Sequence, residues 1–188
     1  MSTTTILFIV IAIVVLWVIF AYNRLVALVN QAKEAWADIQ VQLKRRYDLI
    51  PNLIETVKGY ATHEASVFEN VTKARTAAMD TTDATPAAKA QAENMLSGAL
   101  KTLFAVSEAY PDLKANQNFL QLQKELADTE DKIQASRRFY NTMVMTLNTA
   151  IESFPSNVIA SSFSFKHMDL FELSAADSAA AEPAKVKF

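Results

Sequence analysis

The sequence predicts an all-α fold, in which an N-terminal transmembrane helix continues into an antiparallel four-helix bundle with long helices. Three observations support this class. The 188 residues include only two glycines, too few for the turns of an all-β protein. Apolar residues recur at helical spacing along most of the chain. An unbroken apolar run near the N-terminus approaches the length needed to cross a bilayer.

The apolar run extends from Ile6 to Tyr22 and contains no charged residue, proline or glycine. As a helix it covers roughly 26 Å, slightly less than the ~30 Å hydrocarbon core of a bilayer. A cleaved signal peptide is the alternative, but it requires a basic start and a small-residue cleavage site. Residues 1–5 contain no Lys or Arg, and the run ends in bulky side chains. We therefore expect an uncleaved anchor over residues 6–22, after a short extension.

A heptad pattern follows the apolar run without an intervening helix breaker. Its positions, spaced alternately by four and three residues, are Leu25, Val29, Ala32, Trp36, Ile39 and Leu43, continued by Arg46 and Ile50. Such a seam is typical of a helix face buried in a bundle, and it also fits a contact between protomers near the membrane. Arg46 is unusual under both interpretations, because a buried charge needs a partner.

Prolines divide the rest of the chain. Pro51 is expected to kink or end the first helix, because proline lacks an N–H and clashes with the preceding turn, and Asp48 is placed to cap the second helix. That second helix is expected to fade near Met79, before a polar loop over residues 80–85. Its predicted core positions are Leu53, Ile54, Val57, Ala61, Phe68 and Val71.

Two further helices are predicted. The third runs from Pro86 to Ala109, with Thr85 as its N-cap, and is expected to bury Met95, Leu96, Leu100, Leu103 and Phe104. The fourth runs from about Ala115 to Ser153; its apolar positions are Phe119, Leu122, Leu126, Ile133, Tyr140, Met143, Leu147 and Ile151, with Thr129 and Ser136 filling two seam positions. Short connections imply that neighbouring helices are antiparallel. Together the four helices form a bundle that is expected to occupy residues 23–154.

The pattern changes after Pro155. Residues 161–165 alternate like a short strand, and the segment 155–173 is apolar with little polar cover. We expect its side chains Phe163, Phe165, Met168, Leu170 and Phe171, together with Leu25, Val29 and Trp36 of the seam, to contact a second protomer or the membrane. Residues 174–188 form a low-complexity tail.

Few features of the sequence indicate chemistry. The net charge of −2 gives no support for nucleic-acid binding, and the absence of cysteine removes Cys-based metal sites and nucleophiles. Neither His63 nor His167 has a glutamate three residues before it, so the di-metal pattern of four-helix bundles is missing. We predict no metal, cofactor or catalytic residue. A polar cluster could bind a ligand or lipid headgroup, but a structural network is the favoured interpretation; its members are Arg45, Arg46, Asp48, Asn52, Glu125, Glu130, Arg137 and Asn141, with Thr129 beside them.

Three sequence blocks identify a family. They are YNRLVALVNQAKEAWADIQVQLKRRYDLIPNLIETVKGYATHE at 22–64, YPDLKANQNFLQLQKELADTEDKIQASRRFYN at 110–141 and FPSNVIA at 154–160. The chain resembles LemA-family proteins from Ile6 to about Ala160, although Ser136 stands where the family usually has alanine. The resemblance implies a bacterial membrane protein with a helical bundle and no established enzyme activity. It also implies a link to membrane organisation, because a relative takes part in magnetosome formation.

Two classes of function remain open. The first is a non-enzymatic, single-pass protein whose bundle self-assembles into a homo-oligomer and organises or shapes the membrane. The second is a monomeric adaptor or receptor that binds a ligand or a partner protein through the bundle. Lys and Arg follow the anchor, beginning with Arg24 and Lys33, and none precedes it. The positive-inside rule therefore predicts a cytoplasmic bundle on the bacterial inner membrane.

Overall fold

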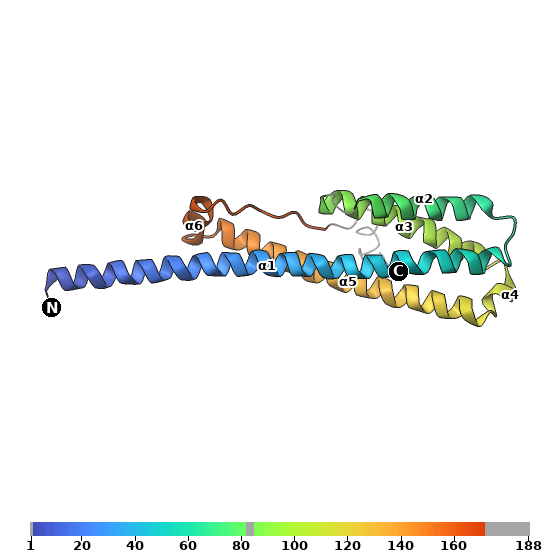
Figure 1. Cartoon of the computed structure of the whole chain (residues 1–188), viewed down its shortest axis with the longest axis horizontal. Coiled ribbons are helices and arrows are strands. Elements are labelled where there is room, and N and C mark those ends of the chain that lie inside the picture. The colour runs from blue at the N-terminus through green and yellow to red at the C-terminus, as the bar shows by residue number, and fades with distance from the viewer. Residues whose placement is uncertain (1, 82–84, 172–188) are drawn as a thin grey trace, which may run out of the picture. The chain divides into compact units, whose positions relative to one another are not determined.

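The computed structural model describes residues 2–81 and 85–171, and within these ranges it contains helices and no strand. The helices are α1 (Thr3–Lys58), α2 (Ala65–Asp80), α3 (Pro86–Ser107), α4 (Pro111–Lys114), α5 (Gln117–Glu152) and α6 (Ser156–Ser162) (Figure 1). The predicted all-α class with a long apolar N-terminal helix is therefore confirmed. The predicted tail at 174–188, the end of the apolar segment at 172–173 and part of the polar loop at 82–84 lie outside the described residues.

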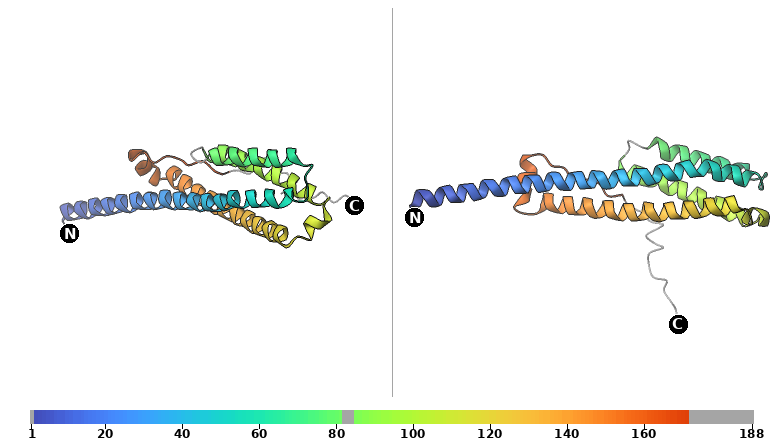
Figure 2. Two further views of the ribbon diagram at one scale, coloured as in Figure 1. Left: turned by 45° about the vertical axis from the view of Figure 1, so that its right-hand side comes forward. Right: turned by 60° about the horizontal axis from the view of Figure 1, so that its bottom comes forward.

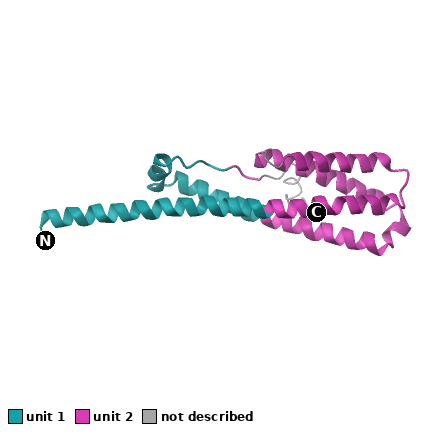
Figure 3. Ribbon diagram, in the orientation of Figure 1, with its two compact units in different colours: residues 1–38, 137–168 teal, residues 39–136, 169–188 magenta. Residues whose placement is uncertain are grey.

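The chain divides into two compact units (Figure 3). Unit 1 is formed by residues up to 38 together with 137–168. Unit 2 is formed by residues 39–136 together with the described residues from 169 onward. The two long helices, α1 and α5, each contribute one part to both units.

Unit 2 contains four helical segments that alternate in direction: the last part of α1, α2, α3 and the first part of α5 (Figures 1 and 2). Their apolar faces form a common core, as the heptad seam of α1 predicts. The side chains at most 2% exposed include Ile39, Leu43, Ile50, Leu53, Val57, Val71, Leu96, Leu103, Leu113, Phe119 and Ile133. Met95, predicted to be buried, is 61% exposed. The α3 seam runs instead through Lys89, Glu93, Leu96, Leu100 and Leu103, all buried.

Unit 1 is built on a core to which α1, α5 and α6 all contribute. Its buried residues are Ala21, Leu25, Leu28, Leu147, Ile151, Ile159 and Ala160. The segment after α6 is held against α5 by Asn148, whose Nδ2 donates to the Met168 carbonyl (2.9 Å) and whose Oδ1 accepts from the Met168 N–H (3.0 Å). Both backbone groups of Met168 are thereby satisfied, which explains how an irregular segment can lie over an apolar core.

Pro51 is expected to kink or end the first helix; α1 does not end there but continues to Lys58, and α2 begins only at Ala65. Proline has no N–H, so the Tyr47 carbonyl, four residues earlier, loses its intrahelical donor. The structure supplies another donor, because Nε of Arg75 on α2 lies 2.8 Å from the Tyr47 carbonyl oxygen. This tertiary hydrogen bond replaces the missing helical one and allows the helix to pass through the proline.

The strand predicted over residues 161–165 is wrong, because α6 extends to Ser162 and is followed by a turn. Ser164 adopts a positive φ of 59°, Phe165 N–H donates to the Ala160 carbonyl (2.9 Å), and Ser164 N–H donates to the Ser161 carbonyl (3.3 Å). These two bonds around a left-handed residue form a Schellman motif. The alternation of Ser and Phe therefore arises from a helix end, where Phe165 turns back onto the core of unit 1.

The third and fourth predicted helices are found with small changes at their ends. Thr85 caps α3 as predicted: its hydroxyl oxygen accepts from the Ala88 N–H (3.3 Å), and Pro86 occupies the first turn. α3 ends at Ser107 and α5 begins at Gln117, after the single turn of α4. The Asn116 side chain accepts from the Phe119 N–H (3.0 Å), which provides the N-cap of α5.

Candidate functional site

The largest group of buried polar side chains lies in unit 2 around Arg46, which is 4% exposed. Its Nη2 donates to the Ser97 hydroxyl (2.8 Å), and its Nη1 lies 3.2 Å from Glu130 Oε2 and 3.6 Å from Glu93 Oε2. Arg46 thus connects α1 to α3 and to α5. The buried guanidinium therefore makes a hydrogen bond to a hydroxyl and ion pairs with two carboxylates, as a buried charge requires.

Glu93 is the second centre of this network, with 3% exposure. Its Oε1 accepts a hydrogen bond from the Tyr47 hydroxyl and lies 3.9 Å from Lys89 Nζ. Burial raises the pKa of Glu93 above its usual range, although Tyr47, Arg46 and Lys89 all favour the ionised form. Burial, together with the nearby Glu93 carboxylate, also raises the pKa of Tyr47. These opposing effects are expected where a carboxylate and its donors share a poorly solvated site.

Lys89 completes the network on the side of α2. Its Nζ donates to the Ala78 carbonyl (2.7 Å) and lies 5.4 Å from the centre of the Tyr47 ring, a cation–π distance. Burial lowers the pKa of Lys89, and Glu93 opposes that shift. Two cations, Arg46 and Lys89, therefore face two carboxylates, Glu93 and Glu130, so the charges within this group balance. The arrangement suits the stabilisation of four packed helical segments.

The structure places the predicted network residues in different environments. Arg46 and Glu130 are brought together as an ion pair. Arg45, Asp48 and Asn52 are exposed on α1, outside the group around Arg46. Glu125 accepts from Gln121 on its own helix, and the Thr129 hydroxyl donates to the Glu125 carbonyl. Arg137 is buried and Asn141 is half-buried, both in unit 1.

The side chains predicted to contact another protomer or the membrane are mostly used within the chain. Leu25 belongs to the core of unit 1, with Val29, Phe165 and Met168 packed against it. The Trp36 ring lies 5.2 Å from that of Tyr140, Leu170 is half-buried, and Phe171 is 1% exposed. Phe163, 55% exposed, is the member of this set with the largest free surface. The contact of this set with another protomer or with the membrane remains a prediction, and Phe163 has the most surface available for it.

Histidines and acidic residues do not gather into a metal site within the described ranges, where no group of three or more His, Asp or Glu side chains has suitable geometry. His63 is exposed on the connection after α1. His167 Nε2 lies 3.0 Å from Glu152 Oε1 at the surface of unit 1. That pair ties the segment after α6 to the end of α5.

Sequence reasoning missed Tyr47, Arg75, Lys89 and Glu93. A signal for the last two was present: Lys89 and Glu93 precede Leu96 by seven and three residues, which places them on the helix face that Leu100 and Leu103 continue. Charged residues on an apolar seam indicate a buried pair. Arg75 had the same signal, lying between Val71 and Ala78 at four- and three-residue spacing.

Comparison with known proteins places these features in a wider context. The model of the LemA family matches residues 35–188. The chain is 29% identical to Protein LemA of Metamycoplasma hominis over 154 residues, which covers 81% of this chain and 69% of that protein. It is 24% identical to magnetosome protein MamQ of Magnetospirillum gryphiswaldense and 25% identical to MamQ 2 of Paramagnetospirillum magneticum, covering 80% of this chain and 64% of each relative. The chain thus spans slightly less than two thirds of the magnetosome proteins. None of these names is that of an enzyme.

Proposed function

We propose that this chain, which belongs to the LemA family, is a non-enzymatic, single-pass membrane protein that organises or shapes the bilayer. The observation that carries the proposal is the continuity of α1. This helix is the one among the described residues that is long and apolar enough to cross a membrane. Its apolar run passes without a loop into the core of unit 1, beginning at Ala21 and Leu25. A packed domain directly joined to an anchor is held close to the lipid surface.

A second apolar feature lies beside the end of the anchor. We call Phe154, Val158 and Phe163 the apolar corner; they are 83%, 53% and 55% exposed where α5 turns into α6. The Phe163 ring lies 4.8 Å from that of Tyr22, the last residue of the apolar run. The corner therefore stands at the depth where aromatic residues enter the membrane interface. Inserting it into one leaflet would stabilise binding and spread the lipid headgroups.

Self-assembly is the proposed means of acting over a larger membrane area. Within the described part of the apolar run, Val18 is half-buried, Ala21 is buried and the remaining side chains are exposed. These side chains are available for lipid or for a second copy. The heptad seam offers less support than its pattern suggested, because Leu25 and Trp36 already pack inside unit 1.

The decisive experiment measures both mass and membrane shape with the full chain. Mass in nanodiscs should give a uniform oligomer, whereas a monomer would favour the alternative of a membrane-anchored adaptor. On vesicles, the wild type should reduce vesicle diameter or form tubules. Replacing Phe154, Val158 and Phe163 with serine should abolish that effect. The matched control is Phe139→Ser, because Phe139 is 51% exposed on α5 but lies roughly 22 Å along the helix from Phe154.

Topology completes the proposal. Basic residues follow the anchor, starting with Arg24 two positions after the apolar run, and the positive-inside rule then places the helical units in the cytoplasm of a bacterial cell. Protease added to intact spheroplasts should leave the protein uncut beyond its N-terminus. Efficient digestion of the helical units would indicate the opposite orientation, with the units outside the cytoplasm, and would not argue against the anchor.

A further inference from the structure

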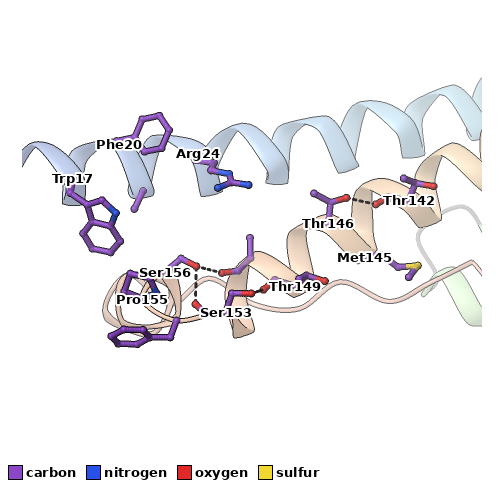
Figure 4. A pocket seen from close by; sticks show the side chains of 13 residues that line it. Trp17, Phe20, Arg24, Thr142, Met145, Thr146, Thr149, Ser153, Pro155 and Ser156 are labelled. Atoms are coloured by element: carbon purple, nitrogen blue, oxygen red, sulfur yellow. Dashed lines mark hydrogen bonds between the residues drawn. The ribbon is translucent and has the colours of Figure 1, made fainter.

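Unit 1 contains a pocket of about 660 Å³ between α1 and the last part of α5. This volume is typical of sites for small molecules or headgroups. The polar and aromatic side chains relevant here are Trp17 and Arg24 from α1, and Thr142, Thr146, Ser153 and Ser156 from α5 and the start of α6. Figure 4 shows Trp17 and Arg24 below α1, with Trp17 above the turn at Pro155, and Thr142, Thr146, Thr149 and Ser153 following one another toward the end of α5.

Arg24 supplies the cation of the pocket. It is exposed, and no hydrogen bond or ion pair engages its guanidinium among the residues that the structure describes. Guanidinium binds phosphate oxygens through paired N–H donors. This end of the pocket therefore suits an anion, and a phosphodiester is the anion that every membrane phospholipid presents.

The hydroxyl groups of Thr142, Thr146, Ser153 and Ser156 can only accept further hydrogen bonds, because each already donates its proton to a backbone carbonyl. Thr142 donates to the Arg138 carbonyl (2.9 Å), Thr146 to the Thr142 carbonyl (2.8 Å) and Ser153 to the Thr149 carbonyl (2.7 Å). Ser156 donates to the carbonyls of Ala150 (2.7 Å) and Ser153 (2.8 Å). A hydroxyl has one proton and two lone pairs, so each oxygen is left as an acceptor. This row of acceptors suits a ligand that carries N–H donors.

The end of α5 strengthens the preference for a cation. The helix C-terminus carries partial negative charge from its aligned peptide dipoles. α5 ends at Glu152, beside this pocket, and its last turn contains no basic residue to neutralise that charge. An ammonium group near Ser153 and Ser156 would therefore gain from both the hydroxyl oxygens and the helix end.

The depth of the pocket matches a lipid headgroup. Trp17 lies within the apolar run, and Arg24 lies two residues beyond its end. Seven residues of helix separate them by roughly 10 Å. With Tyr22 at the membrane interface, where the anchor ends, Arg24 lies at the level of the phosphates and Trp17 lies deeper, beside the acyl chains.

We propose that this pocket binds the phosphoethanolamine headgroup of a membrane phospholipid. The phosphodiester contacts Arg24, and the ammonium donates to the hydroxyl oxygens of Ser153 and Ser156, which lie close together at the end of α5. This inference rests on the membrane anchoring proposed above. It adds a lipid preference that anchoring alone does not require.

The test is lipid binding to the full chain in detergent micelles, followed by native mass spectrometry. The probes are dioleoyl-phosphatidylethanolamine, its N-methyl and N,N-dimethyl derivatives, and dioleoyl-phosphatidylcholine. This series keeps the phosphate and the positive charge while removing N–H donors one at a time. Affinity should fall at each step and by at least about tenfold over the series, the factor associated with a hydrogen bond to a charged group. Equal affinity for the first and last members would overturn the proposal.

Variants separate the two halves of the pocket. Arg24→Met should weaken binding of every lipid in the series, whereas Arg138→Met, an exposed arginine of the same unit that does not line the pocket, should not. Ser153→Ala combined with Ser156→Ala should remove the preference for the ethanolamine headgroup and leave phosphatidylcholine binding unchanged. An unaltered preference in that double variant would contradict the role given to the hydroxyl row.

Two further measurements distinguish a lipid headgroup from a free solute, and headgroup binding from membrane anchoring. Soluble phosphoethanolamine at millimolar concentration should compete only weakly, because it lacks acyl chains beside Trp17. If it binds as tightly as the lipid, the site takes a free solute and the lipid proposal fails. Retention of the chain in nanodiscs reports on anchoring by itself. Retention without headgroup preference would reject this inference alone, and loss from the nanodiscs would reject the anchored function.

Discussion

The hydrogen bond from Arg75 to the Tyr47 carbonyl makes a prediction about how α1 tolerates Pro51. The carbonyl loses its usual donor because residue 51 has no N–H, and Arg75 Nε replaces that donor at 2.8 Å. Arg75→Met keeps most of the apolar stem and removes the donor. A hydrogen bond to a charged group contributes about 1.5–3 kcal/mol. Because Arg75 is half-buried, we expect a loss near the lower end of that range.

Pro51→Ala provides the second variant. Pro51 is exposed, so the change leaves no cavity, and the new alanine restores an N–H to the Tyr47 carbonyl. Proline in a helix interior costs about 3 kcal/mol relative to alanine. Arg75 already offsets part of that cost, and the more flexible unfolded chain removes up to about 1 kcal/mol of the gain. A net stabilisation of about 1–2 kcal/mol is expected.

The double variant tests the mechanism. In the Pro51→Ala background, Arg75→Met should cost less than about 0.5 kcal/mol, which gives a coupling energy of about 1 kcal/mol or more between residues 51 and 75. Hydrogen exchange measured on α2 peptides of the full chain in detergent reports the opening free energy of unit 2. Arg45→Met, an exposed arginine on α1 in the same unit, is the matched control. Equal costs of Arg75→Met in both backgrounds would refute the explanation of the unbroken helix.

Three further predictions concern single side chains. Arg46→Ala leaves Glu93 buried beside fewer cations and should lower the unfolding free energy of unit 2 by about 3–5 kcal/mol. The control, Arg45→Ala, should change it by less than about 0.5 kcal/mol. Thermal unfolding of the two variants measures the difference. Burial raises the pKa of Tyr47 above its usual value of 10.0, so the unfolded state loses this proton first. The contribution of the protonated Tyr47 side chain to the unfolding free energy of unit 2 is complete below pH 10. Above pH 10 that free energy falls by about 1.4 kcal/mol per pH unit. In Tyr47→Phe the unfolding free energy should not show this fall above pH 10. If the wild type and the variant have parallel profiles of stability against pH, Tyr47 is not the group responsible. Ser164→Gly should stabilise unit 1 by about 1 kcal/mol, because glycine adopts the positive φ of 59° without strain. Hydrogen exchange over residues 156–168 should then become slower. Faster exchange would contradict the prediction.

Periodicity predicted the helices well because each helix has one face that must be buried. The seam through Leu25, Ile39 and Leu43 is buried as its spacing indicates, and Leu96 and Leu103 form the core face of α3. Local rules failed where tertiary contacts override them. A helix break at Pro51 is sound for an isolated helix, but a donor from α2 removes much of its cost. The Ser–Phe alternation at 161–165 has a period of two and gave no indication of the Schellman turn that produces it.

The polar network shows where sequence reasoning reaches its limit. Arg46, Lys89 and Glu93 each interrupt an apolar seam, and a charged side chain in that position must find a partner when the helices pack. The existence of a buried network therefore follows from the pattern. The identity of the pairs does not, because it depends on how far each helix is shifted along its neighbour. That shift depends on where α1 ends and α2 begins, at Lys58 and Ala65, and a helix that ended at Pro51 would give a different register. With the correct register, Tyr47 and Arg46 on α1 face Glu93 on α3 in one group, and the charges that weaken each seam singly stabilise the packed unit together.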